Sequence, residues 1–399
     1  MKIENKTLGE IFGLMTWQHK IMVIAGCLFL LMILIYLPMV FFRSATTENN
    51  PPGPIKIATI ERSLGTLDPT ISSDGKKTIM AFTNIVKPAG KGDYISSEIR
   101  IANATPGCRR WLPTRGGLVS RAEEIIGPDN ITPVKKGVWR VETPSIVYDP
   151  GDTGHEWKLF AYRYFWADSA PLARLYSMIV YSTASATDMK WSDEQWLFAA
   201  NDAAPPAPYG TLVRTRLNAL HPSLTNVYFY ARPSVIMAGT DMLMTLSAFV
   251  QGKDSVDRVV MIGSRDHGKT WQYLGTPLTS DDVGKAGKFT KLGGATLVAH
   301  NGKIYLSAVF GDETAEGLGS FVFGFSNLGT GTLARNAKTG APVMLNHIGS
   351  MSAAPTKLGG GAAAHDDSCL GGMIISEYSG TRKAFTLFNT QQPPVKTGD

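Results

Sequence analysis

Five segments of the sequence repeat one pattern, in which an alternating apolar strand is followed by a tight turn and a second apolar strand. The segments begin at Asp68, Glu142, Arg232, Gly294 and Gly361. Turns such as Ser73-Asp74-Gly75 and His300-Asn301-Gly302 suit hairpins. The starts are about 60 to 90 residues apart, which leaves room for four strands and their loops. Repeated four-stranded units that close into a ring predict an all-β, five-bladed β-propeller over residues 57–399.

The composition agrees with a fold of short strands and turns. The chain has 399 residues, of which 18% are charged and 41 are glycine, against averages of about 25% charged and about 7% Gly in soluble domains. This excludes a disordered chain, a coiled coil or a large helical bundle. A β-sandwich is the competing all-β fold, but it does not explain similar strand pairs over more than three hundred residues. The stretches Arg121–Ile126 and Ser192–Ala200 are interpreted as short helices or loops.

A long apolar segment near the N-terminus predicts a membrane anchor. Residues Ile21–Phe42 carry no charge, and at about 1.5 Å per residue they would cross a hydrocarbon core of about 30 Å. The apolar run is too long for a cleavable signal peptide and lacks small residues at its end. A buried core helix is the alternative. Residues 43–56 contain three prolines and read as a short tether.

The charges that flank this segment predict its orientation. Lys2, Lys6 and Lys20 precede it, whereas Arg43 alone follows it closely. By the positive-inside rule, residues 1–20 would be cytoplasmic and the propeller would lie on the extracytoplasmic side. The sequence therefore predicts a single-pass signal anchor that contacts the lipid bilayer through residues 21–42.

Several classes of partner and cofactor find no support in the sequence. The net charge of +6 is mild and its Lys and Arg residues are scattered, so nucleic acid is not expected as a partner. No P-loop, dinucleotide fingerprint or G-x-S-x-G motif occurs, and no cofactor is predicted. His155, His300 and His365 lack a close metal-binding spacing. His365-Asp366-Asp367 could contact a cation such as calcium, but its match to the hairpin turn of the fourth repeat favours a turn, so no metal site is predicted.

The cysteines fit an extracytoplasmic domain. Cys27 lies in the apolar segment, which leaves Cys108 and Cys369 outside it. An oxidising compartment permits a bond between them, while two separately buried thiols fit the sequence equally well. Cys108 follows the strands of the first repeat and Cys369 lies in the fifth. In a closed five-bladed ring these two blades are neighbours, so a bond would tie the ends of the ring together.

One segment matches the Asp-box pattern S-x-D-x-G-x-T-W completely. The matching residues are Ser264, Asp266, Gly268, Thr270 and Trp271. In such a turn the Asp and Ser side chains bond the backbone of the turn, and the Trp packs into the sheet. Asp266 is therefore interpreted as structural rather than catalytic. The motif is typical of propeller blades and says nothing about chemistry.

Residues at the starts of the inner strands are the main candidates for a site, because these starts converge at the central funnel of a propeller. They are Asp68, Glu142 and Arg232, with Gly294 and Gly361 leaving open space. The second strand of each blade runs back to the same face and adds Arg163, Asp312, Glu313 and Glu377. Aromatic side chains beside them could stack on a sugar ring, namely Tyr164, Trp166 and Tyr378.

This arrangement resembles the five-bladed propeller glycoside hydrolases, which include arabinanases, xylosidases, invertases and levansucrases, over roughly residues 57–390. Leu67-Asp68-Pro69 resembles the first-blade Asp-Pro, which implies that Asp68 is the base or nucleophile. Val141-Glu142-Thr143-Pro144 is similar to the Glu-x-Pro of invertase-like members, which implies that Glu142 is the acid. The intervening Asp of the family is missing, and Arg232-Pro233 occupies the comparable position.

Glycoside hydrolysis needs one protonated and one ionised carboxyl on opposite sides of the glycosidic bond. Asp68 and Glu142 are the predicted pair, Glu377 is a further catalytic candidate, and Arg163 and Arg232 are predicted to bind substrate or to keep one acid ionised. The sequence thus predicts a membrane-anchored extracytoplasmic glycosidase or transglycosidase that acts on a polysaccharide or oligosaccharide. The alternative, favoured by the missing Asp, is a noncatalytic propeller that binds glycan or protein in an envelope or surface assembly.

Overall fold

The computed structural model describes residues 53–58, 63–86, 96–114, 117–118, 121–126, 133–167, 174–200, 213–253, 255–312, 318–349, 363–365, 367, 369–379 and 384–396. The chain divides into two units, Met1–Glu48 and Asn49–Asp399. No helix in the described ranges is long and apolar enough to cross a membrane. The predicted anchor at residues 21–42 lies outside those ranges, as do Gly361, Glu313 and Asp366.

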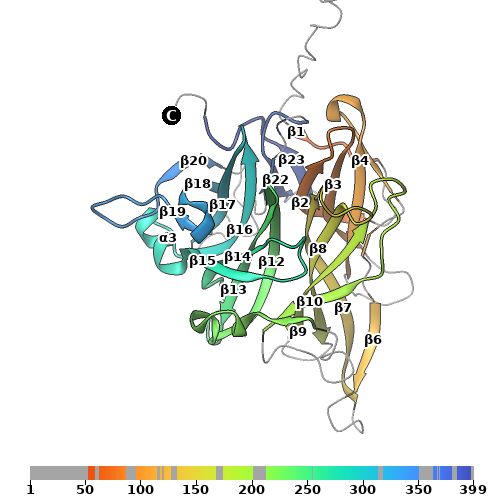
Figure 1. The fold of residues 1–399 in the computed structure, drawn as a ribbon, viewed down its shortest axis with the longest axis horizontal. Helices are drawn as coiled ribbons and strands as arrows, with labels where there is room; N and C mark the ends of the chain where they lie inside the picture. The colour runs from red at the N-terminus through yellow and green to blue at the C-terminus, as the bar shows by residue number, and fades with distance from the viewer. Residues whose placement is uncertain are drawn as a thin grey trace, which may run out of the picture. The chain divides into compact units, whose positions relative to one another are not determined.

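The second unit is a five-bladed β-propeller, as the repeats predict (Figure 1). The first sheet contains β2 (Ser63–Ser73), β3 (Thr78–Val86), β4 (Ser96–Ala104) and β5 (Trp111–Pro113). The second contains β6 (Arg121–Ile126), β7 (Pro133–Tyr148), β8 (Trp157–Ala167), β9 (Arg174–Ala184), β10 (Gln195–Ala199) and β11 (Thr215–Arg216). The third contains β12 (Val227–Ala238), β13 (Asp241–Val250), β14 (Arg258–Ser264) and β15 (Gln272–Thr279).

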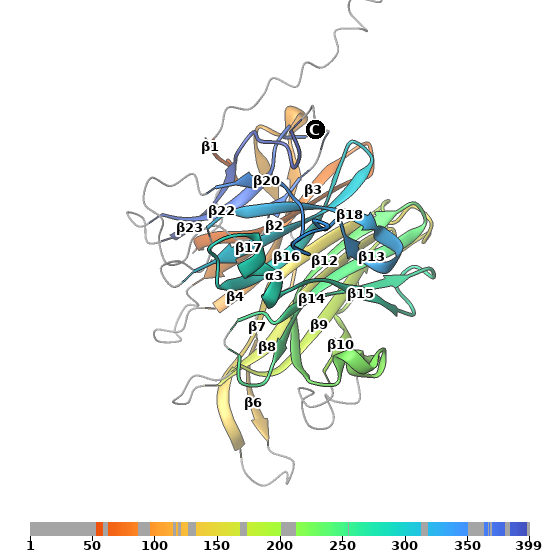
Figure 2. The same ribbon diagram turned by 90° about the vertical axis from the view of Figure 1, so that its left-hand side faces the viewer.

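The fourth sheet contains β16 (Lys291–His300), β17 (Lys303–Gly311), β18 (Ser320–Asn327), β19 (Thr332–Leu333) and β20 (Met344–Ile348). The fifth contains β21 (Ala363–Ala364), β22 (Ile374–Ser379), β23 (Ala384–Asn389) and β1 (Gly53–Pro54). Short helices connect some strands: η1 (Pro106–Cys108), η3 (Leu217–Ala219), η4 (Pro222–Leu224), α3 (Ser280–Ala286) and η5 (Leu328–Thr330). Consecutive strands within the sheets pair antiparallel, except for β10 and β11, which pair parallel. The innermost strands β2, β7, β12, β16 and β21 follow one another in that order around the ring. Figure 2 shows the sheets from a second side.

Two segments expected as helices or loops form strands instead. Arg121–Ile126 is β6, which pairs with the N-terminal half of β7, and Gln195–Ala199 is β10, at the outer side of the second sheet. Both expectations were wrong because pairing with a long neighbouring strand supplies the backbone hydrogen bonds that local sequence does not reveal. The predicted hairpins at Ser73-Asp74-Gly75 and His300-Asn301-Gly302 are confirmed by the pairing of the flanking strands.

The ring is closed in two ways between the first and the fifth sheet. The strand β1, from the segment predicted as a tether, pairs antiparallel with β23 and so completes the last blade. Cys108 and Cys369 form a disulfide, with their Cα atoms 5.5 Å apart and a separation of 261 positions in sequence. Of the two alternatives that the sequence leaves open for these cysteines, the structure contains the bonded one.

Three inner strands share a β-bulge whose first residue has a positive φ angle, namely Asp68 (52°), Thr143 (51°) and Arg232 (53°). In β16 the register shift falls between Leu292 and Gly294, and Gly294 also has a positive φ angle (135°). Positive φ is uncommon for residues other than glycine, and here it turns the side chains of Asp68, Thr143 and Arg232 toward the axial cavity while strand pairing continues on both sides of each bulge.

A hydroxyl two residues after each bulge joins neighbouring blades. Thr70 accepts a hydrogen bond from the backbone N–H of Ile146 at 3.2 Å. Ser145 and Ser234 accept equivalent bonds from Val235 and Leu297, each at 2.8 Å. The recurring Pro-Thr and Pro-Ser sequences therefore have a structural reason: each hydroxyl satisfies a donor of the next inner strand, which would otherwise be buried without a partner.

Candidate functional site

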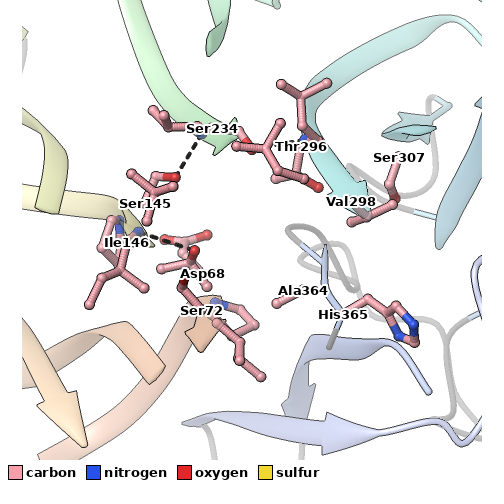
Figure 3. A pocket seen from close by; sticks show the side chains of 18 of the residues that line it. Asp68, Ser72, Ser145, Ile146, Ser234, Thr296, Val298, Ser307, Ala364 and His365 are labelled. Atoms are coloured by element: carbon pink, nitrogen blue, oxygen red, sulfur yellow. Dashed lines mark hydrogen bonds between the residues drawn. The ribbon is translucent and has the colours of Figure 1, made fainter. Parts of the chain in front are cut away.

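A cavity of about 330 Å³ lies on the propeller axis and is lined by the inner strands of all five sheets (Figure 3). This is at the small end of the range for ligand pockets, about 300–1,000 Å³. Its titratable lining residues are Asp68, Arg232, His365 and Asp367. The wall between them is apolar with several hydroxyls, which include Ser72, Thr296 and Ser307.

Asp68 is a buried acid in the cavity wall. Its side-chain oxygen Oδ2 accepts a hydrogen bond from Thr83 Oγ1 at 3.2 Å, and its backbone N–H donates to Ser376 Oγ of the fifth sheet at 2.9 Å. Burial raises the pKa of Asp68 to about 6; the charge of Arg232 and the bond from Thr83 oppose this rise, and the charge of Glu142 adds to it. Asp68 can therefore hold or release a proton near neutral pH.

Arg232 lies across Gly294, the equivalent position of the next blade. A Cβ atom on Gly294 would come within 2.8 Å of Arg232 Cδ and 3.0 Å of Arg232 Nη1. The open space predicted at Gly294 is thus where the arginine side chain lies. The positive charge of Arg232 favours the ionised form of the buried Asp68 carboxyl and so lowers its pKa, against the effect of burial.

Glu142 does not occupy the position in the second blade that corresponds to Asp68. The bulge residue there is Thr143, and Glu142 precedes it by one. Its carboxylate accepts hydrogen bonds from Tyr164 Oη at 2.7 Å and from Ser97 Oγ of the first sheet at 3.3 Å, and it is not among the residues that line the cavity. An alignment of the repeats on Pro69 and Pro144 would have placed Thr143 at the bulge.

The other predicted site residues also lie outside the cavity lining. Arg163 is buried and forms an ion pair with Glu194, and Tyr164 is buried against Tyr162 with ring centroids 5.0 Å apart. Trp166 is half-buried, and the guanidinium of Arg140 lies over its ring at 4.6 Å.

Two of the predicted residues lie on β22 of the fifth sheet. Glu377 is buried there and does not line the cavity. Tyr378 follows it on the strand, with its side chain outside the described part of the structure.

Two hydroxyls next to Asp68 were missed by reasoning from the sequence. Thr83 donates to the Asp68 carboxyl and accepts from the backbone N–H of Thr143 at 2.9 Å, while Ser376 accepts from the backbone of Asp68. Each lies on the second strand of one blade and contacts the inner strand of the next. Small hydroxyl residues in the middle of apolar strands, as in Ala81-Phe82-Thr83-Asn84, are the sequence signal that could have identified them.

In the turn from Ser264 to Trp271, the side chains of Ser264, Asp266, Thr270 and Trp271 form hydrogen bonds within the turn, while His267 Nδ1 lies 2.9 Å from Asp149 Oδ2 outside it. Asp266 Oδ1 accepts from Ser264 Oγ and from the Thr270 backbone, both at 2.8 Å, and Asp266 Oδ2 accepts from Thr270 Oγ1 at 2.6 Å. Trp271 Nε1 donates to the Gly268 carbonyl at 3.0 Å, while its ring packs 5.5 Å from Phe198. Desolvation alone would raise the pKa of Asp266, but the bonds from Thr270, Ser264 and Lys269 lower it to about 2.

We expect Asp266→Asn to lower the stability of the propeller. The lost charge-assisted bonds are worth about 1 kcal/mol, or roughly 2 °C in Tm for a domain of this size. Because the folded pKa of about 2 lies below the unfolded value, this stability is present at neutral pH and is lost as the pH falls through that window. Melting curves at pH 7 and pH 2.5 test this. A difference between variant and wild type that is larger at pH 2.5 would contradict it.

Comparisons with known proteins relate the chain to others through its fold. No family model and no curated protein matches the sequence. Solved structures similar to this chain include propeller-type glycoside hydrolases. One is from a study of GH130 mannoside phosphorylases and hydrolases that target β-1,2-mannosidic linkages in Candida mannan, with 10% identity, a TM-score of 0.43 and coverage of 88% of this chain and 94% of that one.

The Trypanosoma rangeli sialidase is 13% identical, with a TM-score of 0.40 over 86% of this chain and 58% of the sialidase. An exo-1,5-α-L-arabinanase from a bovine ruminal metagenomic library is 12% identical, with a TM-score of 0.40 over 70% of this chain and 78% of that one. A fold does not determine the chemistry of a site, which depends on the residues of the site itself.

Proposed function

We propose that this protein processes glycans outside the cytoplasm, as a glycosidase or transglycosidase whose reacting bond lies at Asp68. The observation that supports the proposal is the environment of the Asp68 carboxyl. Asp68 lies at a β-bulge with a positive φ angle, its side chain lines the axial cavity, and burial raises its pKa to about 6. Burial of an acid and strain in its backbone both cost stability, and such costs concentrate at functional sites.

The chemistry requires a second carboxyl with the opposite protonation state. Glu142 is the candidate, since its charge acts on Asp68 and its carboxylate is held by Tyr164 and Ser97. The raised pKa makes Asp68 the proton donor in this proposal and leaves Glu142 as base or nucleophile. This reverses the roles implied by the resemblance to invertase-like propellers.

The test is cleavage of a panel of plant, microbial and host polysaccharides and oligosaccharides, with new reducing ends and transfer products as the readout. Wild type should cleave at least one of them. Asp68→Asn and Glu142→Gln should each lose about 10²–10⁴-fold in rate, because each keeps the shape of the side chain and removes the proton-transferring group. Asp281→Asn, an exposed acid on α3, is the matched control and should cleave at the wild-type rate.

A noncatalytic glycan-binding propeller is the second candidate. It is favoured by the placement of Glu142 and Glu377, neither of which lines the cavity with Asp68. In this case wild type cleaves none of the panel, and Arg232→Ala weakens retention of a glycan on an affinity column while Asp281→Asn does not. A cleaved glycan would exclude this candidate, whereas equal cleavage by wild type and both carboxamide variants would exclude the acid pair.

We further propose that residues 21–42 anchor the protein in a membrane with residues 1–20 on the cytoplasmic side. The uncharged length of the segment and its lysine-bearing N-terminal flank support this. Protease added to intact cells or spheroplasts should then digest residues 57–399 and spare the N-terminus. Protection of the propeller in intact cells, with digestion after lysis, would reverse the orientation.

A further inference from the structure

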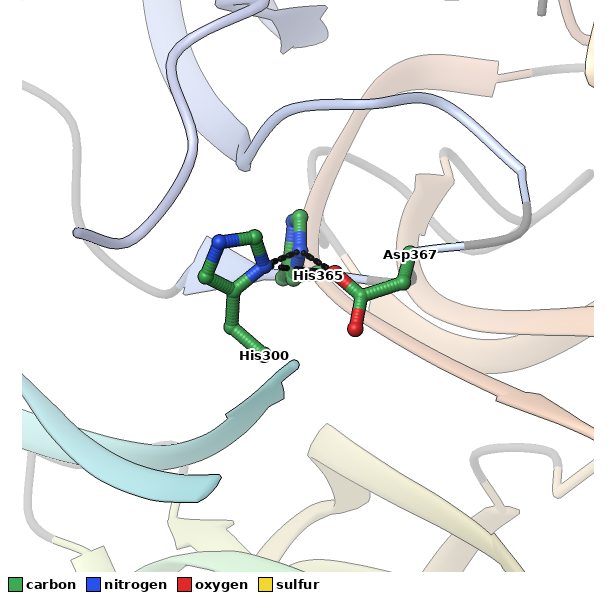
Figure 4. A group of neighbouring side chains, drawn as sticks. All are labelled: His300, His365 and Asp367. Atoms are coloured by element: carbon green, nitrogen blue, oxygen red, sulfur yellow. Dashed lines mark hydrogen bonds and ion pairs between the residues drawn. The ribbon is translucent and has the colours of Figure 1, made fainter. Parts of the chain in front are cut away.

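Two histidines and one aspartate meet between the fourth and fifth sheets (Figure 4), and two of them, His365 and Asp367, line the axial cavity. His300 is the last residue of β16, and His365 and Asp367 follow β21. The two histidines are 65 residues apart in sequence, which is why no spacing motif brings them together. Asp68 comes from the first sheet and is not a member of this cluster, although His365 and Asp367 line the same cavity.

The potential ligand atoms of the three residues form a small triangle. His300 Nδ1 lies 2.5 Å from Asp367 Oδ1 and 3.1 Å from His365 Nε2, and His365 Nε2 lies 2.8 Å from the same oxygen. Tetrahedral zinc with bonds of about 2.0–2.2 Å separates its ligand atoms by about 3.3 Å. Small shifts of these side chains would therefore place all three atoms around one ion.

Hydrogen bonding alone does not satisfy this triangle. If each histidine donates to Asp367 Oδ1, the two N–H groups face each other across 3.1 Å. If one of the two nitrogens is unprotonated, its lone pair faces the carboxylate oxygen Oδ1, and these two acceptors cannot form a hydrogen bond with each other. His365 is also enclosed, with its side chain 1% exposed and its second nitrogen, Nδ1, buried without a hydrogen-bond partner among the described residues. A metal cation between the three atoms would accept a lone pair from each of them, so that no proton is needed between the two nitrogens and Oδ1.

Asn301 is in place to orient two of the three ligands. Its backbone N–H donates to Asp367 Oδ2 at 2.8 Å, which leaves Oδ1 directed at the histidines. Its side-chain amide lies 3.1 Å from His300 Nε2. With the amide oxygen turned toward it, Asn301 would accept the Nε2 proton and leave the Nδ1 lone pair available. Outer partners of this kind are usual around metal-bound histidines and carboxylates.

We propose that His300, His365 and Asp367 bind a divalent transition metal ion of the zinc class. Two imidazoles and one carboxylate suit zinc and its neighbours, whereas calcium prefers oxygen ligands throughout. The Asp367 side chain is 45% exposed, so a fourth position remains open to water or to a ligand in the cavity. The ion would tie the fourth sheet to the fifth.

The experiment uses the full chain in detergent, purified without a histidine tag and treated with a chelator that is then removed. Zn²⁺ alone is titrated by calorimetry, and bound metal is counted after desalting. We expect one equivalent to bind, and we expect Tm to rise with Zn²⁺ concentration because the metal binds the folded state. Co²⁺ in place of Zn²⁺ should give the visible absorption of a low-symmetry, four-coordinate site.

Two variants and a control decide whether the site is the one named. Asp367→Asn keeps the shape of an exposed side chain, and His300→Ala removes one ring; each should weaken Zn²⁺ binding at least about 10–100-fold, since even outer partners of metal ligands are worth that much. His155→Ala, at an exposed turn, should bind like wild type. The proposal is overturned if folded wild type binds less than one equivalent, or if both variants retain wild-type affinity. Neither result depends on whether a glycan is cleaved.

Discussion

Replacing Cys108 and Cys369 with serine is expected to lower the free energy of unfolding of the propeller by about 5 kcal/mol. The disulfide joins residues 261 positions apart, so in the chain-entropy model it restricts the unfolded chain more than a short loop would. It also lies at the seam where β1 must pair with β23 for the ring to close. The double variant should therefore melt earlier, and reduction of wild type should reproduce most of the change.

The measurement is denaturant unfolding without reductant, with thiols counted on the denatured, unreduced protein. Cys27→Ser is the matched control, because Cys27 lies in the predicted anchor and should leave the propeller's unfolding midpoint unchanged. Two free thiols from the propeller domain of wild type would refute the bond. Equal midpoints for wild type and the double variant would show that pairing of β1 alone holds the seam.

The repeat pattern was sufficient to predict the propeller, because each blade carries its own turn residues and strand alternation. It could not place every strand. The strands β6 and β10 form by pairing with long neighbours, and their own sequences carry no strong alternation. Tertiary context decides such cases.

The site was partly predictable for a related reason. Asp68 and Arg232 precede prolines at blade starts and do line the cavity. Glu142 was placed one residue out of register, since a β-bulge shifts which side chain faces the axis.

The cluster of His300, His365 and Asp367 shows a different limit. Its members come from two blades, and what brings them together is the packing of neighbouring blades rather than any local spacing. The same holds for Thr83 and Ser376, whose hydroxyls act across blade boundaries. In a propeller the functional residues converge on the axis from every repeat. The sequence therefore shows which residue types each repeat contributes, but it does not show which of these residues contact one another.

Asp68→Asn is expected to stabilise the propeller at neutral pH although it removes the proposed proton donor. The folded pKa of about 6 exceeds the unfolded value of about 3.9, so between these values the folded state binds more protons than the unfolded state. The destabilisation of the folded state by ionised Asp68 is therefore absent below about pH 4. It grows as the pH rises to about 6 and reaches its full size above that pH. Two pKa units correspond to about 3 kcal/mol, which the carboxamide cannot incur because it does not ionise.

Urea unfolding of wild type and Asp68→Asn at pH 4, 6 and 8 measures this directly. The variant should match wild type at pH 4 and exceed it by up to about 3 kcal/mol at pH 8, while Asp281→Asn should show no such trend. A difference that does not change with pH would mean that Asp68 does not titrate near 6, and the proton-donor role would lose its basis. A pH-dependent gain in stability together with loss of glycan cleavage would instead show that the fold bears the cost of a buried acid at the position where the chemistry needs it.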